Sequence, residues 1–279
     1  GYTEMAAVLG TGEIWLRVPE TIRIEINGEL PANVMSKDVI LRIIGDLTAA
    51  GATYRALEFT GDTVEAMSLS SRMTMANMGI EAGAKCALFA PDEKTAEYLG
   101  IELTDAERAL TGDADAPCEK VLRYRAEDFV PVMALPSNVD HVAAIRDLEP
   151  VAIDQVFLGS CTNGRLEDLM AAAEILKGKH IAPFVKLIVT PASRKIWEEA
   201  EANGTLATLS AAGAMITHPS CGLCCGRTGG ILSDGERVVA TNNRNFLGRM
   251  GSSKVEIYLA SPKSAAASAL TGKLTEAAC

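Results

Sequence analysis

The sequence is poor in aromatic and basic residues, and it contains no long apolar run. Aromatic residues make up 5% of its 279 residues, and 26 Lys and Arg stand against 36 Asp and Glu, so the formal net charge is −10. Because nucleic acids and anionic lipids attract basic surfaces, this balance argues against both as the main partner. A membrane-spanning helix needs roughly 18 consecutive apolar residues, which the sequence lacks. We therefore expect no nucleic acid and no membrane among its partners.

The N-terminal segment and the cysteines point to a reducing compartment. The first five residues contain no basic stretch followed by an apolar core, so they are not a secretory signal, and the missing initiator Met predicts processing or truncation. An odd number of unevenly spaced cysteines argues against a secreted disulfide scaffold and for a cytoplasmic location. The seven cysteines are Cys86, Cys118, Cys161, Cys221, Cys224, Cys225 and Cys279.

Apolar segments of strand length alternate with helical segments along the chain. The expected strands are Thr21–Ile26, Tyr54–Phe59, Cys86–Phe89, Val151–Leu158, Phe184–Val189 and Ala214–Ile216. The expected helices are Tyr2–Trp15, segments beginning at Ser36 and Thr63, Ser71–Gly83, Leu166–Leu176 and Ser193–Ala202. Residues 92–125 are acidic and are expected to form a loop-rich linker with short helices. This alternation predicts an α/β fold with parallel, partly mixed sheets flanked by helices, in two units.

Three cysteines crowd into positions 221–225, and Cys161 directly follows an expected strand. Ligands gather at the carboxyl ends of parallel strands, so Cys161 can meet Cys221 and Cys224 there. Electron-transfer clusters normally use four cysteines, whereas three thiolates leave one iron without a protein ligand. By analogy with catalytic zinc, such an open metal position polarises a substrate oxygen. The expected chemistry is the removal or addition of a hydroxyl group.

Other interpretations of the cysteines stay open. A thioredoxin-like redox pair is disfavoured, because the Cys221–Cys224 spacing lacks a Trp-Cys-Gly-Pro context. Together with His218, the three cysteines could instead form a structural Cys₃His zinc site. Cys225 is ambiguous, since neighbouring cysteines do not usually both bind one compact cluster. The remaining cysteines are expected to be core or surface thiols.

Two further groups of residues suit an acidic substrate. Arg244 and Arg249 lie close together in a Gly-containing segment, and two guanidinium forks can hold a di- or tricarboxylate. Asn77 and Glu81 are four residues apart and would share one helical face, where Glu81 could position or protonate a leaving hydroxyl. Taken alone, each group is better explained as solvated surface residues.

Four segments, in this order, resemble motifs of the aconitase family. They are Asn77-Met-Gly-Ile-Glu81, Gly159-Ser-Cys-Thr-Asn163, Cys221-Gly-Leu-Cys224 and Asn243-Arg-Asn-Phe-Leu-Gly-Arg249. The resemblance implies an aconitase-like fold with a [4Fe–4S] cluster on Cys161, Cys221 and Cys224. It also implies that Arg244 and Arg249 hold substrate carboxylates. The residues Asn77, Glu81 and Asn243 would line the site, with Glu81 at the hydroxyl.

The resemblance extends to a subfamily, the two-subunit isopropylmalate dehydratases of leucine biosynthesis. It implies a hydro-lyase that moves a hydroxyl between adjacent carbons, with a small subunit that supplies a swivelling domain. Homoaconitate and dimethylmalate are alternative substrates, and a non-catalytic zinc or RNA-regulatory protein is the alternative from another class. The N-terminal third of such a subunit has no counterpart here, so the chain is expected to be inactive alone. The implied division is a remnant domain over 1–33 and α/β domains over 34–125 and 126–279.

Overall fold

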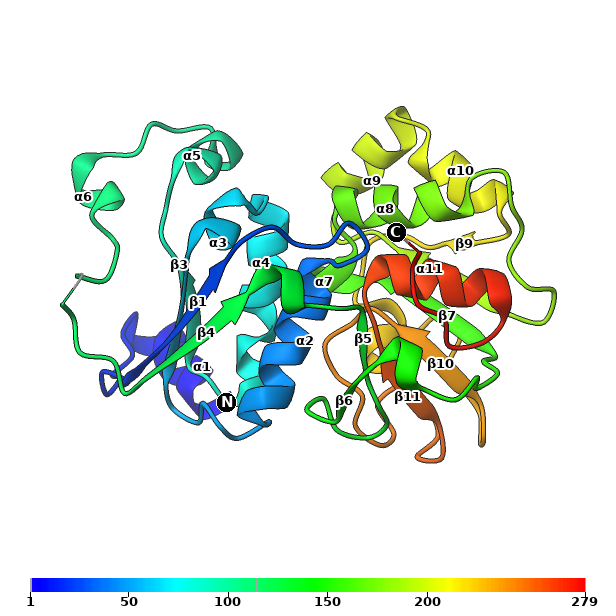
Figure 1. The fold of residues 1–279 in the computed structure, drawn as a ribbon, viewed down its shortest axis with the longest axis horizontal. Coiled ribbons are helices and arrows are strands. Elements are labelled where there is room, and N and C mark those ends of the chain that lie inside the picture. Colours follow the sequence, from blue (N-terminus) through cyan, green and yellow to red (C-terminus); the bar gives the residue numbers. More distant parts are fainter. Residues whose placement is uncertain (1, 114, 279) are drawn as a thin grey trace.

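A computed structural model describes residues 2–113 and 115–278, which form two α/β lobes beside each other (Figure 1). The first lobe comprises residues 21–128 and the second comprises residues 131–278. Within these described residues, no helix is long and apolar enough to cross a membrane.

A four-stranded parallel sheet forms the first lobe, in the order β3-β2-β1-β4. Side chains alternate along β1, and its Ile22, Ile24 and Ile26 are buried beneath the helices. The strands are β1 (Thr21–Asn27), β2 (Ala56–Thr60), β3 (Cys86–Phe89) and β4 (Lys120–Arg125). The helices, with 3₁₀ helices marked η, are α2 (Ser36–Leu47), α3 (Asp62–Ala66), α4 (Leu69–Met78), η1 (Gly79–Ala82), α5 (Glu93–Leu99), α6 (Asp105–Arg108) and η2 (Ala126–Asp128).

A seven-stranded mixed sheet forms the second lobe, in the order β6-β5-β11-β10-β7-β8-β9. The strands β7 to β11 run parallel, whereas β5 and β6 are antiparallel at one edge. Every residue of β7 is buried, as expected for a central strand covered on both faces. The strands are β5 (Val132–Ala134), β6 (Val142–Ala144), β7 (Gln155–Gly159), β8 (Lys186–Thr190), β9 (Met215–Ile216), β10 (Arg237–Ala240) and β11 (Glu256–Leu259). The helices are η3 (Ile145–Asp147), α7 (Ser160–Asn163), α8 (Leu166–Leu176), α9 (Arg194–Ala202), α10 (Thr205–Ala211), η4 (Gly222–Cys225) and α11 (Pro262–Thr271).

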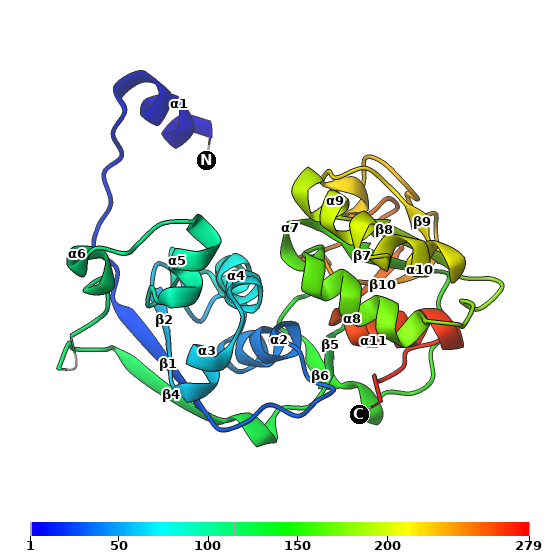
Figure 2. The ribbon, with the colours of Figure 1, turned by 90° about the horizontal axis from the view of Figure 1, so that it is seen from above.

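The α/β class and the mixed sheets confirm the prediction from the sequence, but several elements differ. The expected linker contains β4, which pairs along its whole length with β1. Four strands of the second sheet, β5, β6, β10 and β11, were not predicted. The N-terminal helix α1 (Tyr2–Thr11) ends before Trp15, contains no buried residue and stands apart from both lobes (Figure 2). The three-domain division stays a prediction, although β1 lies in one sheet with β2, β3 and β4.

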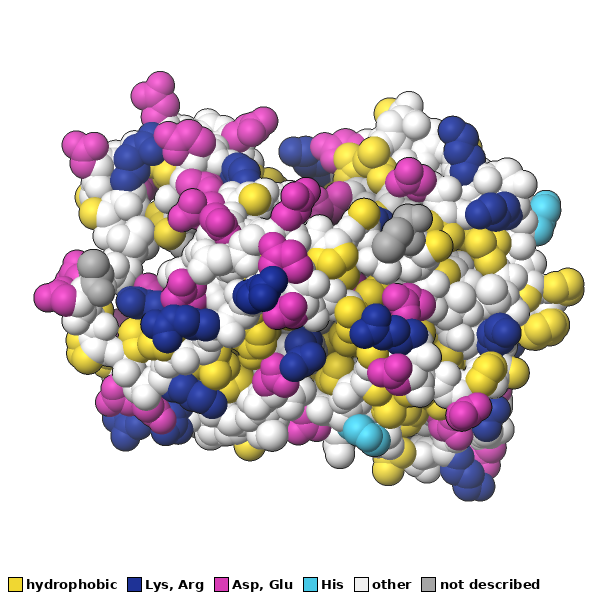
Figure 3. All heavy atoms as spheres, in the orientation of Figure 1, with side chains coloured by type: hydrophobic (Ala, Val, Ile, Leu, Met, Phe, Trp, Pro, Cys, Tyr) yellow, Lys and Arg dark blue, Asp and Glu magenta, His cyan; other side chains and the backbone are white. Residues whose placement is uncertain are grey.

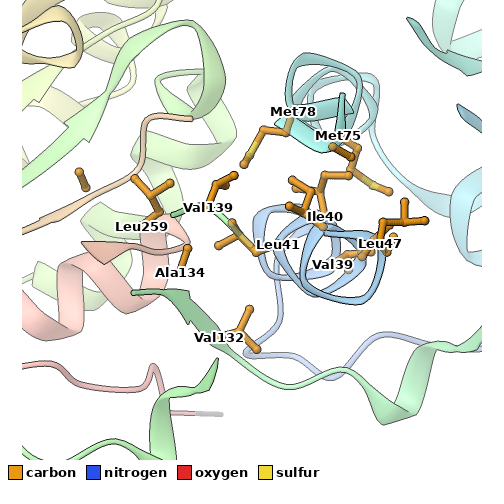
Figure 4. Packing of buried hydrophobic residues seen from close by; sticks show 14 of the residues in the cluster. Val39, Ile40, Leu41, Leu47, Met75, Met78, Val132, Ala134, Val139 and Leu259 are labelled. Atoms are coloured by element: carbon orange, nitrogen blue, oxygen red, sulfur yellow. The ribbon is translucent and has the colours of Figure 1, made fainter. Parts of the chain in front are cut away.

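Helix α2 joins the two lobes through an apolar interface. Its nine buried residues belong largely to a core that includes strands from both sheets. In Figure 4, Leu41 of α2 faces Ala134 and Val139 of the second lobe, while Ile40 lies beside Met75 of α4. Burying apolar side chains on both sides of α2 fixes the lobes relative to each other. Charged side chains of both signs are interspersed over the face of the molecule seen in Figure 3.

Candidate active site

The four motif segments meet where the lobes face each other. The first lobe contributes the end of α4 and the following η1, and the second lobe contributes α7, η4 and the loop after β10. Helix α4 packs directly on α7, which brings Asn77 next to the turn that carries Cys161. Since α7 begins where β7 ends, the site lies at the carboxyl edge of the parallel strands, as the sequence predicts.

Cys161 lies on a tight turn that has little conformational freedom. Gly159 has a φ of 145° and Ser160 a φ of 71°, a left-handed conformation that side chains rarely adopt. A Cβ at Gly159 would lie 2.1 Å from the carbonyl oxygen of Thr190, so only glycine fits beside β8. Strained backbone of this kind concentrates at functional sites. The turn leaves the Cys161 side chain exposed at the sheet edge.

The second cysteine turn packs against the same residue of β8. Gly222 has a φ of 50°, and a Cβ there would lie 3.0 Å from Thr190 Oγ1. This close approach brings η4 to the end of β8, beside the Cys161 turn. Cys224 is buried, whereas Cys221 is exposed. The neighbouring Cys225 donates to the carbonyl of Gly222 at 3.5 Å, a contact within its own turn.

Two asparagines connect Cys161 with Cys224. Asn77 Nδ2 donates to Cys161 Sγ at 3.6 Å, and Asn77 Oδ1 accepts from Thr162 Oγ1 at 3.0 Å and from Asn243 Nδ2 at 3.4 Å. Asn243 Oδ1 in turn lies 4.0 Å from Cys224 Sγ. Asn77 belongs to the first lobe and Asn243 to the second, and each faces the sulfur of a different cysteine turn.

Glu81 lies on η1 rather than on the helix that carries Asn77. The expectation of a continuous helix was wrong here, because α4 ends at Met78 and Gly79 begins a tighter 3₁₀ turn. The two side chains nevertheless converge, since Asn243 Nδ2 lies 3.3 Å from Glu81 Oε1 and 3.4 Å from Asn77 Oδ1. Arg244 Nε donates to the same Glu81 oxygen at 2.9 Å.

Burial and the arginine act on Glu81 in opposite directions. Only 11% of its side chain is exposed. Desolvation raises the pKa of Glu81 and outweighs the lowering effect of the Arg244 guanidinium. A carboxyl group with a raised pKa retains a proton closer to neutral pH, which suits a group that donates to a hydroxyl.

The two arginines of the Asn243–Arg249 loop face the site. Arg244 is paired with Glu81, and Arg249 Nη2 lies 3.5 Å from Cys224 Sγ. Arg249 also lies over the ring of Phe246, with its Cζ 5.3 Å from the centroid. Its buried Nε has no hydrogen-bond partner among the described residues, so it leaves a donor for a further acceptor.

The cysteine sulfurs are not arranged as a closed metal centre. Among the described residues, no three Cys, His, Asp or Glu side chains group closely enough to hold a metal ion, and Cys221 stands exposed. His218 instead stacks on Trp197, with ring centroids 5.1 Å apart. The donor set still suits a cluster, because Cys161, Cys221 and Cys224 are free thiols and N–H groups face two of the sulfurs. Cys279 lies outside the described residues.

Several buried residues beneath the site have no recognisable sequence pattern. Lys37 falls within the helical segment expected to begin at Ser36, yet its side chain is completely buried against the loop after β10. Asp168 of α8 accepts a hydrogen bond from the buried Asn163 at 3.1 Å, and it supports the Cys161 turn from behind. No local pattern separates such residues from ordinary helix caps, because only the tertiary fold buries them.

The fold and the site define an α/β protein with thiols, amides, a carboxylate and guanidinium groups gathered at the carboxyl edge of a sheet. The chain belongs to the aconitase family: the sequence profile described as "Aconitase family (aconitate hydratase)" matches residues 1–272.

Curated relatives with high identity are named as one type of subunit. The "3-isopropylmalate dehydratase large subunit 1" of Methanopyrus kandleri is 50% identical over 276 residues, which are 99% of this chain and 66% of that protein. The "3-isopropylmalate dehydratase large subunit 2" of Archaeoglobus fulgidus is 46% identical over 99% of this chain and 67% of that protein. The chain thus spans about two thirds of the length of these relatives. A crystal structure of aconitase X from Thermococcus kodakaraensis (holo-form) matches with a TM-score of 0.45 and 14% identity over 85% of this chain and 53% of that chain, too weakly to add to the assignment.

Proposed function

We propose that this chain is the cluster-binding part of a 3-isopropylmalate dehydratase large subunit, a hydro-lyase of leucine biosynthesis. The observation that carries the proposal is the bridge between Cys161 and Cys224 through Asn77 and Asn243, flanked by Glu81. Thiols, amides, a carboxyl group and guanidinium groups meet there at one sheet edge. The names of the relatives supply the reaction class, since the chain is up to 50% identical to them over nearly its whole length.

The residues that would hold a [4Fe–4S] cluster are Cys161, Cys221 and Cys224. When bound by three thiolates, such a cluster supplies an iron with Lewis-acid character for a substrate hydroxyl. The three thiols would have to approach one another on binding, because the described residues contain no group of three side chains close enough to hold a metal ion. The free Nε of Arg249 and its neighbouring nitrogens would hold one substrate carboxylate in a bidentate contact.

Glu81 and the asparagines would act on the hydroxyl. Burial favours the protonated form of Glu81, so this carboxyl can hold a proton at Oε1 or Oε2 close to the departing group. Asn77 and Asn243 would orient that group through their amide nitrogens. Arg244 would hold a second carboxylate while it keeps Glu81 in place, since its side chain is 40% exposed and reaches the open side of the site.

The rest of the enzyme would come from other segments and chains. A small subunit is the expected partner, because the relatives are named as large subunits. We expect the chain to need both this partner and the remaining third of the large subunit for turnover. The site residues bind features that all substrates of this class share, so homoaconitate and dimethylmalate stay as alternatives. The cytoplasmic location also stays a prediction from the cysteine pattern.

An anaerobic assay of the complete large subunit with its small subunit tests the proposal. We expect dehydration of isopropylmalate and rehydration of the resulting alkene, with weaker or no turnover of homocitrate and citrate. Roughly four irons per chain and no zinc should accompany activity. The absence of turnover on all three acids, with the cluster intact, would refute the enzymatic function. One zinc per chain would instead support a structural site that includes His218.

A pair of cysteine variants localises the cluster. Cys161→Ser should lose iron and sulfide together, because it removes one of three proposed ligands. Cys225→Ser is the matched control, since this thiol's hydrogen bond among the described residues stays within its own turn, at Gly222, and iron content should stay at the wild-type level. Equal iron loss in both variants would show that the assignment of ligands is wrong.

A further inference from the structure

Lys37 is a completely buried lysine at the boundary between the lobes. Its side chain is 0% exposed, although it lies in the first turn of α2. Burying an ammonium group is unfavourable unless it is well paired. No carboxylate among the described residues lies within salt-bridge distance of Lys37. Packing alone therefore does not explain a lysine at this buried position.

The contacts of Lys37 are specific. Its Nζ donates to the carbonyl oxygens of Thr241 and Asn242, at 2.9 Å and 2.7 Å. These two residues directly precede Asn243 and Arg244 in the loop after β10. Helix α2 of the first lobe is thereby tied to the loop that presents the polar groups of the site.

Thr241 extends this connection to the Cys161 turn. The Gly159 amide donates to Thr241 Oγ1 at 2.9 Å, and that hydroxyl lies 3.4 Å from the carbonyl oxygen of Asn163. The amide of Thr241 in turn donates to Phe157 at 3.0 Å. Thr241 thus accepts a hydrogen bond from Lys37 at its carbonyl oxygen, while its side-chain hydroxyl bonds to both ends of the cysteine turn.

The neighbouring Asp38 fixes the position of Lys37. Its Oδ1 accepts a hydrogen bond from the amide of Val132 on β5, and its Oδ2 accepts from the amide of Met35. The first turn of α2 is therefore held at both strand β5 and the loop after β10. Burial lowers the pKa of Lys37 to about 7, while nearby acidic groups, led by Asp168 and Cys224, favour its charged form.

We propose that Lys37 is a positioning residue that locks Thr241 and Asn242, and thereby holds Asn243 and Arg244 in register with Cys161. The consequence for substrate rests on the proposed function, whereas the ordering of the two segments does not. Loss of Lys37 leaves the buried carbonyls of Thr241 and Asn242 without this donor. The loop and the cysteine turn should then loosen together.

Hydrogen–deuterium exchange of the iron-free chain tests the ordering directly. In Lys37→Met, we expect peptides that cover residues 157–164 and 238–249 to exchange at least about tenfold faster. Peptides from β1, β2 and α9 should be unchanged. Lys37→Gln retains an amide donor without the charge, and it should recover part of the protection. If Lys37→Met does not fold, Lys37→Gln alone should show the same local pattern at smaller amplitude.

Lys94→Met is the matched control. The Lys94 ammonium also donates to three backbone carbonyls, those of Glu65, Ala66 and Met67, but all three belong to the first lobe and none to the loop after β10. This variant should leave exchange at 157–164 and 238–249 unchanged. Unaltered exchange of these peptides in both Lys37 variants, or faster exchange spread equally over both lobes, would overturn the proposal.

Kinetics separate this inference from the proposed function. In the complete enzyme, Lys37→Met should raise KM at least about tenfold, with a smaller effect on kcat, because the residue positions binding groups and touches no reacting atom. A fall in kcat alone would contradict a positioning role. If the wild-type enzyme shows no turnover, the proposed function fails, while the exchange experiment still decides the role of Lys37.

Discussion

Replacing Arg244 by Met should destabilise the protein in a pH-dependent way. The change removes the guanidinium that lies 2.9 Å from Glu81, and it leaves a carboxylate that is only 11% exposed without its partner. Breaking a fully buried pair is unfavourable by about 3–5 kcal/mol, and exposed pairs contribute about 0–1 kcal/mol. Because Arg244 is 40% exposed, solvent screens this pair. We expect a loss of about 1–2 kcal/mol at pH 8.

The loss should shrink at low pH. The pKa of Glu81 is already raised by burial, and removing the cation raises it further. A carboxyl whose folded-state pKa is raised contributes stability below its unfolded pKa, and this contribution is lost as the pH rises through the folded value. At pH 5 the variant can protonate Glu81 and so avoid the unpaired charge. Urea unfolding of the iron-free chain at pH 5 and pH 8 measures the difference.

Two comparisons make the experiment decisive. In a Glu81→Gln background, Arg244→Met should change the free energy of unfolding by the same small amount at both pH values, because no charge remains to be paired. Arg42→Met breaks an exposed pair with Asp46 and should change stability by at most about 0.5 kcal/mol. An equal loss at pH 5 and pH 8 in the single Arg244 variant would refute the reasoning.

Three further predictions follow from the same geometry. Gly159→Ala places a Cβ 2.1 Å from the Thr190 carbonyl at a φ of 145°, so circular dichroism melts should show a lowered Tm and iron should no longer be retained; an unchanged Tm would contradict the steric argument. Arg249→Lys should raise KM at least about tenfold with iron content intact, since an ammonium cannot form the fork, and unchanged KM would count against carboxylate binding. Burial raises the pKa of Asp168 to about 7, so its stabilising contribution is full below about pH 4 and is lost as the pH rises to about 7. Asp168→Asn should therefore flatten the decline in the free energy of unfolding over that range, and an unaltered slope would show that Asp168 does not titrate there.

Periodicity predicted the parts of the fold that are locally encoded. The alternation over Thr21–Ile26 matches β1, and the capped apolar segment after Ser36 matches α2. The strand β4 was missed because Lys120–Arg125 carries mostly exposed and charged side chains at the edge of the sheet, and its partner β1 is about 100 residues away in sequence. Long-range pairing of this kind leaves no local signature.

The position of the site followed from topology, whereas its contacts did not. The carboxyl-edge rule placed Cys161 and the Cys221 turn near each other, and both pack on Thr190. The pairing of Arg244 with Glu81 could not be inferred, because it depends on how α2 holds the two lobes together. The break between α4 and η1 was not predicted, since the residues around Gly79 have a helical pattern and a single Gly does not by itself end a helix.

Basic side chains lie close to the cysteine site. A bound cluster would require Cys161, Cys221 and Cys224 as thiolates, and these charges would repel one another and an ionised Glu81. The structure places Arg249 beside Cys224 and Arg244 beside Glu81. Lys37 lies behind the loop that carries both arginines. All three cations reach the site through or beside one segment, residues 241–249. A change that displaces this segment should therefore disturb both anion pairing and cysteine geometry, even when every side chain of the site is retained.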